Sequence, residues 1–332
     1  MAQVCVLGTG AWGTTLSQVL SDAGHEVIIW GRNQGVVGEI NSSHSNHKFL
    51  PGVYLPENIR ATIDVQEALK FGNVIVLAVP AQSLRENLRS WKSIFPSDLP
   101  IISTLKGIEA DTMSRMTEVV VQELGTDKAL IGLITGPNLA GELSLREPAG
   151  AVAASTNPQI QLLMINLFTT PYFRIYPSDD LLGCELAGAA KSVIALAVGM
   201  TIGMNLGENT QAMIITRGLS EVARFGQGYG ANPLTFLGLA GMGDIVASCG
   251  SALSRNRQFG EAYGRTGTME AARKEVATTV EGVASASAIR ELAHRVGVEV
   301  PIIEVMADAV TGSITPSQAM ERLMSVSTLA EL

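Results

Sequence analysis

The sequence contains little charge, few aromatic residues and very little cysteine. Charged residues make up 16% of the 332 positions, aromatic residues make up 5%, and the net charge is −8 at pH 7. This acidic balance argues against a protein that binds nucleic acid or a membrane surface, because both tasks need a basic face. Apolar residues make up 46% of the chain, which is enough for a large core and about two domains.

The three cysteines, Cys5, Cys184 and Cys249, lie far apart and form no CxxC pair. An odd and sparse set of this kind is typical of reduced thiols. No signal-peptide pattern precedes the apolar run that starts at Val4. We therefore expect a cytoplasmic protein without disulfides.

The sequence also lacks a long uninterrupted apolar run. The best candidate for a membrane span, 181–206, contains Glu185 and Lys191. Its uncharged part, 192–207, is shorter than the roughly 18 residues that a spanning helix needs, so we expect a buried helix of a soluble domain and no membrane insertion. Histidine is scarce too. His44 and His47 lie in a polar stretch with no acid or thiol nearby in sequence, so no metal site is expected.

A glycine-rich turn directly follows the first apolar run. Residues 4–13 read VCVLGTGAWG, so Gly8, Gly10 and Gly13 form the pattern GxGxxG between a predicted strand and a predicted helix. The first glycine allows a tight turn, the second lets backbone approach a pyrophosphate, and the third lets helix pack on strand. A second strand at 26–30 completes a unit of about 30 residues. The motif therefore predicts a dinucleotide site rather than an ordinary tight turn.

Short β-rich runs alternate with amphipathic stretches up to about residue 176. This alternation predicts an α/β Rossmann domain over residues 1–177, with a doubly wound, mostly parallel sheet. Asp64 is expected to cap a short helix, and residues 41–58 are expected to form a loop that can cover a site. The expected strands are 4–7, 27–30, 74–79, 101–105, 130–134, 149–154 and 173–176. The expected helices include 65–70, 83–94 and 112–124.

After Pro177 the β signal disappears, and Ala, Gly, Met and Leu dominate with helical periodicity. We therefore expect a helical second domain over residues 178–332.

The choice of cofactor is expected to be made at the end of the second strand, where the chain reads Trp30-Gly31-Arg32-Asn33. An acid at this position would bind the adenosine ribose and repel a 2′-phosphate, but none is present. Arg32 can instead pair with a 2′-phosphate. NADP is therefore favoured, and NAD with a solvated Arg32 is the alternative.

Two features of the second half carry candidate chemistry. Lys191 lies in an apolar helical stretch, where desolvation favours an uncharged amine that can exchange a proton with a substrate oxygen. The alternative is a lysine that extends to solvent from the helix edge.

A helical pattern begins at Ser254-Arg255-Asn256-Arg257, and with Ser254 as N-cap this start would suit a bound dianion. A solvated basic turn is the alternative there.

Lys106 follows the predicted strand 101–105, and Gly136 and Asn138 follow the next strand. The carboxyl ends of parallel strands meet at one edge of a sheet, where ligands of such folds bind. These residues are therefore candidates for the same site as the glycine-rich turn.

Seven separated motifs together resemble bacterial NAD(P)-dependent glycerol-3-phosphate dehydrogenases, and the resemblance spans nearly the whole chain. They are Gly8-x-Gly10-x-x-Gly13-Thr14, Thr104-Leu-Lys106-Gly107-Ile-Glu109, Gly136-Pro137-x-x-Ala140-x-Glu142, Lys191, Gly241-x-Gly243-Asp244, Ser254-Arg255-Asn256-Arg257-x-Phe259-Gly260 and Val280-Glu281-Gly282.

The resemblance implies reversible reduction of dihydroxyacetone phosphate to sn-glycerol 3-phosphate, which feeds phospholipid synthesis. It also implies an all-α C-terminal domain of the 6-phosphogluconate dehydrogenase type, with Lys191 as the catalytic proton donor to the C2 oxygen. By matching position, the substrate would be bound by Lys106, Gly136, Asn138, Lys191, Asp244, Ser254, Arg255 and Asn256. The cofactor would be bound at Gly8, Gly10, Ala11, Trp12, Gly13, Arg32, Lys106, Ala140, Arg255, Thr279 and Glu281.

Some points depart from the family or stay open. Asn138 stands where the family usually has Ser or Thr, and Leu139 replaces a common Phe, so we expect altered affinity rather than lost activity. Asp244 would either hold Lys191 or bind a substrate hydroxyl. A homodimer is a reasonable expectation for this family.

Two other functions compete with this interpretation: a reductase of another ketone or 2-hydroxy acid, and a non-catalytic dinucleotide sensor. The basic motif at 254–257 suits a phosphate better than a carboxylate, which argues against the first. The lysine in the apolar helix has no purpose in the second.

Overall fold

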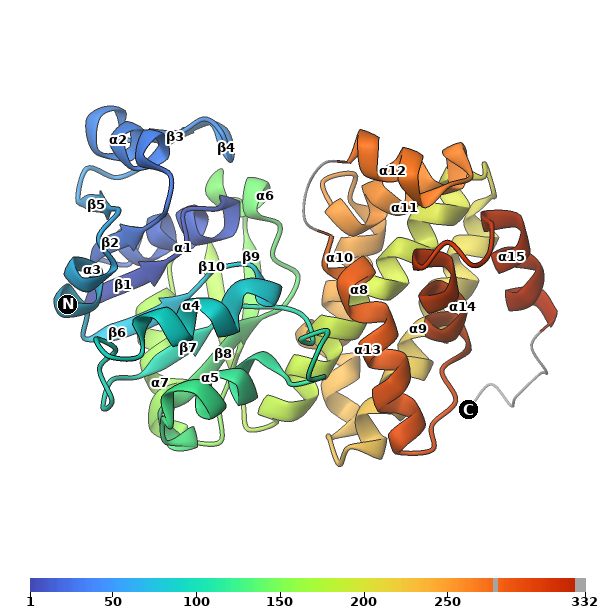
Figure 1. Ribbon diagram of the computed structural model, residues 1–332. Coiled ribbons are helices and arrows are strands. Elements are labelled where there is room, and N and C mark those ends of the chain that lie inside the picture. The colour runs from blue at the N-terminus through green and yellow to red at the C-terminus, as the bar shows by residue number, and fades with distance from the viewer. Residues whose placement is uncertain (277–279, 326–332) are drawn as a thin grey trace. The chain divides into compact units, whose positions relative to one another are not determined.

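The computed structural model describes residues 1–276 and 280–325, and the chain divides into two compact units (Figure 1). Unit 1 comprises Met1–Lys106 and Ser114–Glu185, and unit 2 comprises Gly107–Met113 and Leu186–Leu332. The division therefore falls later than the boundary that we expected at 177/178. It lies inside helix α8 (Leu181–Gly203), and the segment Gly107–Met113 of the first half belongs to the second unit.

Unit 1 is built on an eight-stranded sheet with the order β10-β9-β8-β7-β6-β1-β2-β5. Neighbouring strands are parallel except β8 and β9, which are antiparallel. The chain runs from β1 outward through β2 and returns to the other side of β1 at β6, so β1 marks the switch point of a doubly wound sheet. The strands are β1 (Gln3–Leu7), β2 (Glu26–Trp30), β5 (Ile59–Thr62), β6 (Val74–Leu77), β7 (Ile101–Ser103), β8 (Ile131–Thr135), β9 (Ala149–Ala154) and β10 (Phe173–Ser178).

Helices cover both faces of this sheet, because side chains of each strand alternate between two cores. Val4 and Val6 of β1 belong to one core, with α1, α2 and α7, whereas Cys5 and Leu7 belong to the other, with α3, α4 and α5. The predicted Rossmann fold is confirmed. The helices of unit 1 are α1 (Ala11–Asp22), α2 (Gln34–Ser43), α3 (Val65–Phe71), α4 (Leu84–Trp91), α5 (Met116–Leu124), α6 (Ala140–Ser144) and α7 (Pro158–Phe168), with short turns η1 (Ala81–Ser83) and η2 (Lys128–Leu130).

The predicted loop at 41–58 is wrong. It contains a two-stranded antiparallel hairpin, β3 (Ser45–Asn46) and β4 (Leu50–Tyr54). The hairpin is anchored because Leu50 and Val53 are buried in the first core, which the polar character of the stretch conceals. Strand β5 was also missed.

The predicted short helix with Asp64 as its cap is confirmed, since the Asp64 carboxylate accepts the Gln66 N–H at 2.8 Å. The helix expected at 112–124 begins later, at Met116. Met113 has a φ of +60°, which a right-handed helix does not allow. This break falls where the chain returns from unit 2 to unit 1.

Within the described residues of unit 2, the regular structure is helical, as expected for the second half. Helix α8 (Leu181–Gly203), which starts in unit 1, is long and apolar enough to cross a membrane by length and composition, but 89% of its most apolar window is buried inside the protein. The predicted buried helix is confirmed. The other helices are α9 (Glu208–Gly228), η3 (Pro233–Leu237), η4 (Leu239–Gly243), α10 (Asp244–Gly250), α11 (Arg255–Thr266), α12 (Met269–Glu275), α13 (Glu281–Arg295), α14 (Pro301–Val310) and α15 (Pro316–Ser325).

Helices α8 and α11 cross with their backbones in direct contact. A Cβ added to Gly199 would lie 2.1 Å from the Arg257 carbonyl oxygen, and one added to Gly260 would lie 2.1 Å from that of Leu196. Any larger residue would force the helices apart. The crossing therefore fixes the start of α11 against the helix that carries Lys191.

A buried carboxylate caps helix α14. Both oxygens of Glu221, on α9, accept backbone N–H groups at 2.9 Å, from Ile302 and Ile303 in the first turn of α14. Val300, the N-cap residue of α14, has no side-chain acceptor of its own. Burial raises the pKa of Glu221 to about 7, although the two N–H groups and Arg224 oppose the shift.

Glu221→Gln is expected to lower the free energy of unfolding by about 1–3 kcal/mol at pH 5, because the amide group points a donor at a backbone N–H. In the parent the folded-state pKa lies above the ordinary value of 4.5, so the folded protein binds the extra proton between about pH 4.5 and 7. The difference in the free energy of unfolding between the parent and the variant should therefore shrink as the pH rises through this window and stay constant above it. Thermal unfolding of both proteins from pH 5 to 8 tests this, and parallel curves would contradict it.

Candidate active site

The sequence-predicted residues of unit 1 meet at one edge of the sheet. Strands β1, β2, β6, β7 and β8 run in the same direction, so their carboxyl ends lie together. The glycine-rich turn follows β1, Arg32 follows β2, Lys106 follows β7 and Gly136 follows β8. This is the edge at which ligands of doubly wound sheets bind.

The glycine-rich turn has the geometry that a dinucleotide requires. Gly8 has a φ of +135°, and a Cβ there would lie 2.5 Å from the Ala78 carbonyl oxygen. A Cβ on Gly13 would lie 1.9 Å from the Gly8 carbonyl oxygen. Gly10, by contrast, has nothing within 4 Å of such a Cβ, and it begins α1 without a side-chain cap. Two glycines thus allow close packing, and the third leaves open space at a helix N-terminus, where a pyrophosphate fits.

Two contacts that the sequence did not reveal support this turn. The Asn46 amide, from the hairpin, donates to the Thr9 carbonyl oxygen at 3.0 Å and to the Thr14 hydroxyl at 2.8 Å. A Cβ on Gly31 would lie 2.1 Å from the Thr9 hydroxyl oxygen, so only glycine allows this approach after β2. The stretch that was expected to be a loop therefore holds the glycine-rich turn in place.

The remaining cofactor candidates of unit 1 lie around the same turn. Ala11 and Trp12 form the first turn of α1 and are partly exposed. Ala140 begins α6, and its carbonyl oxygen accepts the Thr15 hydroxyl at 3.2 Å, so α6 is bonded to α1. Arg32 is exposed, and within the described part of the chain its side chain makes no hydrogen bond or ion pair.

Lys106 and Gly136 are in direct contact. The Lys106 Nζ donates to the Gly136 carbonyl oxygen at 2.9 Å, and Gly136 has a φ of +141°, which favours glycine. Asn138 donates its amide to the Gly150 carbonyl oxygen at 3.1 Å. Its Oδ1 atom is buried and accepts no hydrogen bond from any residue that the structure describes. The unusual Asn138 is therefore tied to β9 and keeps an unused acceptor.

Lys191 lies in a buried polar network of unit 2. Its side chain is 10% exposed, so it does not extend to solvent. The ammonium group lies 3.1 Å from the Asp244 carboxylate and donates to the Ser248 hydroxyl at 2.7 Å. Asp244 thus contacts Lys191, and holding this lysine is one of the two roles that the sequence left open for it. Ser248 was missed, although it follows Asp244 by one turn on α10, a spacing that places both on one face.

The start of α11 has the predicted cap, since the Ser254 hydroxyl accepts the Arg257 N–H at 3.4 Å. Arg255, the first residue of the helix, is exposed. The N–H groups of the first turn have no acceptor one turn earlier within the helix, so they add positive potential beside Arg255.

The starts of α11 and α13 both lie on α8. The Asn256 Oδ1 accepts the Gly282 N–H at 2.9 Å, and a Cβ on Gly282 would lie 2.5 Å from the Ser192 carbonyl oxygen. Glu281 is the first residue of α13. Thr279, another cofactor candidate, lies outside the described residues.

The expectation that no acid lies near His47 is wrong, because its Nδ1 pairs with the Glu39 carboxylate of α2. His44 ends α2 with a φ of +45°. Among residues 1–276 and 280–325, no group of three or more His, Cys, Asp or Glu side chains is placed to hold a metal ion. The three cysteines are free and buried.

Comparison with known proteins identifies the family. The model for the N-terminus of NAD-dependent glycerol-3-phosphate dehydrogenase matches residues 3–161, and the model for the C-terminus matches residues 180–321. The chain belongs to this family. Glycerol-3-phosphate dehydrogenase [NAD(P)+] of Streptomyces avermitilis is 45% identical over 99% of this chain and 98% of its own length. That of Corynebacterium glutamicum is 44% identical over the full length of both chains.

The fold comparison agrees with the family. The crystal structure of glycerol-3-phosphate dehydrogenase from Coxiella burnetii matches with a TM-score of 0.92 and 31% identity, covering 98% of this chain and 99% of that one. The resemblance inferred from seven motifs is confirmed, as are the oxidoreductase class and the use of NAD or NADP. The names of the relatives include both cofactors, so the preference for NADP stays a prediction.

Proposed function

We propose that this chain catalyses reversible hydride transfer between NAD(P)H and C2 of dihydroxyacetone phosphate, with sn-glycerol 3-phosphate as the reduced product. The full-length family match supports the reaction. The structural observation that carries the proposal is the buried Lys191 network in the same unit as the cationic start of α11.

Lys191 is the proton donor in this reaction. The reduced dinucleotide, when bound, supplies the hydride, and negative charge then develops on the C2 oxygen. An ammonium group beside that oxygen stabilises the charge and transfers a proton to it. Asp244 and Ser248 hold the lysine in one orientation, so the donor does not have to be ordered during the reaction.

The start of α11 binds the substrate phosphate. Arg255 and the helix N-terminus attract a dianion, and binding at this remote group orients the carbonyl for reaction. We assign the substrate to Lys106, Gly136, Asn138, Lys191, Asp244, Ser254, Arg255 and Asn256. We assign the dinucleotide to Gly8, Gly10, Ala11, Trp12, Gly13, Arg32, Lys106, Ala140, Arg255, Thr279 and Glu281.

The proposal extends to the protein's setting. Residues 1–177 act as the dinucleotide-binding domain and residues 178–332 as the substrate domain. The product supplies phospholipid synthesis in the cytoplasm, and the enzyme works as a homodimer.

The assay that tests this function follows oxidation of NADPH or NADH with dihydroxyacetone phosphate. Turnover of this ketone supports the proposal. Turnover of another ketone or a 2-keto acid alone would favour the other reductase, and dinucleotide binding without turnover of any small ketone would favour a sensor.

Arg32→Ala is expected to lower kcat/KM for NADPH by about tenfold to a hundredfold, because one charge-assisted contact to the 2′-phosphate is lost. The value for NADH should stay within about twofold, since NADH lacks that phosphate. The measurement is the ratio of the two efficiencies before and after substitution. An unchanged ratio would remove Arg32 from cofactor choice.

A further inference from the structure

The chain passes between the two units three times, after Lys106, after Met113 and after Glu185. The last passage lies within α8, which begins in unit 1 and continues as one helix into unit 2. Lys191 lies six residues beyond Glu185 on this helix. The contacts that hold the first turns of α8 in unit 1 therefore determine where the helix that carries Lys191 starts.

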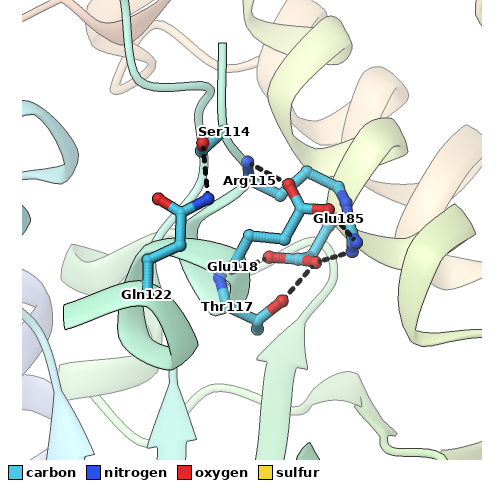
Figure 2. Close-up of polar contacts among 6 residues, drawn as sticks. All are labelled: Ser114, Arg115, Thr117, Glu118, Gln122 and Glu185. Carbon is cyan, nitrogen blue, oxygen red and sulfur yellow. Dashed lines mark hydrogen bonds and ion pairs between the residues drawn. The ribbon is translucent and has the colours of Figure 1, made fainter. Parts of the chain in front are cut away.

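Glu185 makes those contacts, with α5 (Figure 2). Its side chain is 4% exposed and forms an ion pair with Arg115. Its Oε1 accepts the Thr117 N–H at 3.0 Å, and its Oε2 accepts the Thr117 hydroxyl at 2.7 Å. Both carboxylate oxygens are thus bonded to the start of α5.

The start of α5 needs this partner. Arg115 occupies the N-cap position, where a side-chain acceptor is normally found, but a guanidinium group only donates. Glu185 supplies the missing acceptor from another helix. Arg115 also pairs with Glu118 at 2.7 Å, and Gln122 donates to Ser114 at 3.2 Å. Figure 2 shows these side chains beside Glu185. The returning chain is therefore fixed to α5, and α5 is fixed to α8.

These contacts link residues that lie beside two of the three points at which the chain passes between units. Ser114 and Arg115 follow the second passage, and Glu185 precedes the third. Burial raises the pKa of Glu185, and Arg115 and Thr117 counteract that cost. A buried ion pair adds little net stability compared with apolar packing, so its main effect is to select one geometry.

We propose that Glu185 is a positioning residue for the reaction: by bonding α8 to the start of α5, it sets the direction in which the helix presents Lys191. The proposal rests on the proposed function. Six residues of helix span about 9 Å, so a tilt of about 6° at Glu185 would displace the Lys191 backbone by about 1 Å. A displacement of this size at a reacting group can cost about a hundredfold in rate.

Glu185→Gln tests the proposal, because it keeps the shape of the side chain but removes its charge. We expect kcat for dihydroxyacetone phosphate to fall about tenfold or more, while KM for both substrates stays within about twofold. Glu221→Gln is the matched control. It removes the charge of another buried glutamate that caps a helix without a side-chain cap of its own, and here both helices lie within unit 2. It should lower the melting temperature and leave kcat unchanged.

A Glu185→Gln protein that is less stable but has the parent's kcat would overturn the positioning role, as would an equal loss of kcat in both variants. If Glu185→Gln does not fold, Thr117→Val removes one hydroxyl from the cluster and keeps its charges. It should lower kcat about threefold at unchanged KM, and an unchanged kcat there would equally overturn the role. A parent protein that does not reduce dihydroxyacetone phosphate would overturn the proposed function itself, and the positioning role with it.

Discussion

Replacing Lys191 by alanine is expected to lower kcat for dihydroxyacetone phosphate by at least about a hundredfold, which is the usual scale for loss of a general acid. Asp244 at 3.1 Å and Ser248 at 2.7 Å hold the ammonium group in one orientation, which alanine cannot reproduce. KM for the dinucleotide should change little, because the glycine-rich turn lies in the other unit. Steady-state kinetics with NADPH measures both quantities.

The loss has to be separated from damage to the fold, since the substitution leaves the buried Asp244 without its ammonium partner. Small primary amines added to Lys191→Ala should restore part of the turnover if the missing group is a proton donor. Ser248→Ala, which keeps the lysine but removes one of its contacts, should lose only about tenfold. A Lys191→Ala enzyme that retains kcat within about threefold of the parent would show that the lysine is structural.

The sequence allowed prediction of those parts of the site that depend on local geometry. Gly13 is required by its contact with the Gly8 carbonyl oxygen, within one strand–turn–helix unit, and Gly8 by its positive φ. Ser254 caps its own helix. Lys106 and Gly136 were placed together because each directly follows a parallel strand, and the structure joins them at 2.9 Å. Short-range rules and strand direction were sufficient in all these cases.

What the sequence did not reveal depends on partners that lie far apart along the chain. Arg115 and Glu185 are separated by 70 residues, so no local pattern connects them. Asn46 supports the glycine-rich turn from a stretch whose polar composition suggested a loop. The excursion of residues 107–113 into unit 2 was missed because its contacts lie far along the chain: the Ile108 N–H donates to the Ser285 hydroxyl at 3.3 Å.

Removing the phosphate from the substrate is expected to have the second large effect. Unphosphorylated dihydroxyacetone should be reduced with kcat/KM at least about a thousandfold lower than dihydroxyacetone phosphate, because remote binding energy that orients the carbonyl is lost. Arg255→Ala should lower kcat/KM for the phosphorylated ketone by about tenfold to a hundredfold, the value of one charge-assisted contact. It should leave the value for the unphosphorylated ketone within about twofold.

The comparison of two ketones with two enzymes separates phosphate binding from general loss of activity. If Arg255 contacts the phosphate, removing the arginine matters only for the ketone that carries a phosphate, so the effects of the two removals do not add. Arg265→Ala is the matched control. It removes a guanidinium group from the last turn of the same helix, where Arg265 is exposed and pairs with Glu275 at 2.6 Å. That variant should behave as the parent with both ketones. If Arg255→Ala slows both ketones equally, its side chain supports the helix or the dinucleotide, to which it is also assigned, rather than the phosphate. Equal efficiency of the parent with both ketones would remove the phosphate site from α11 altogether.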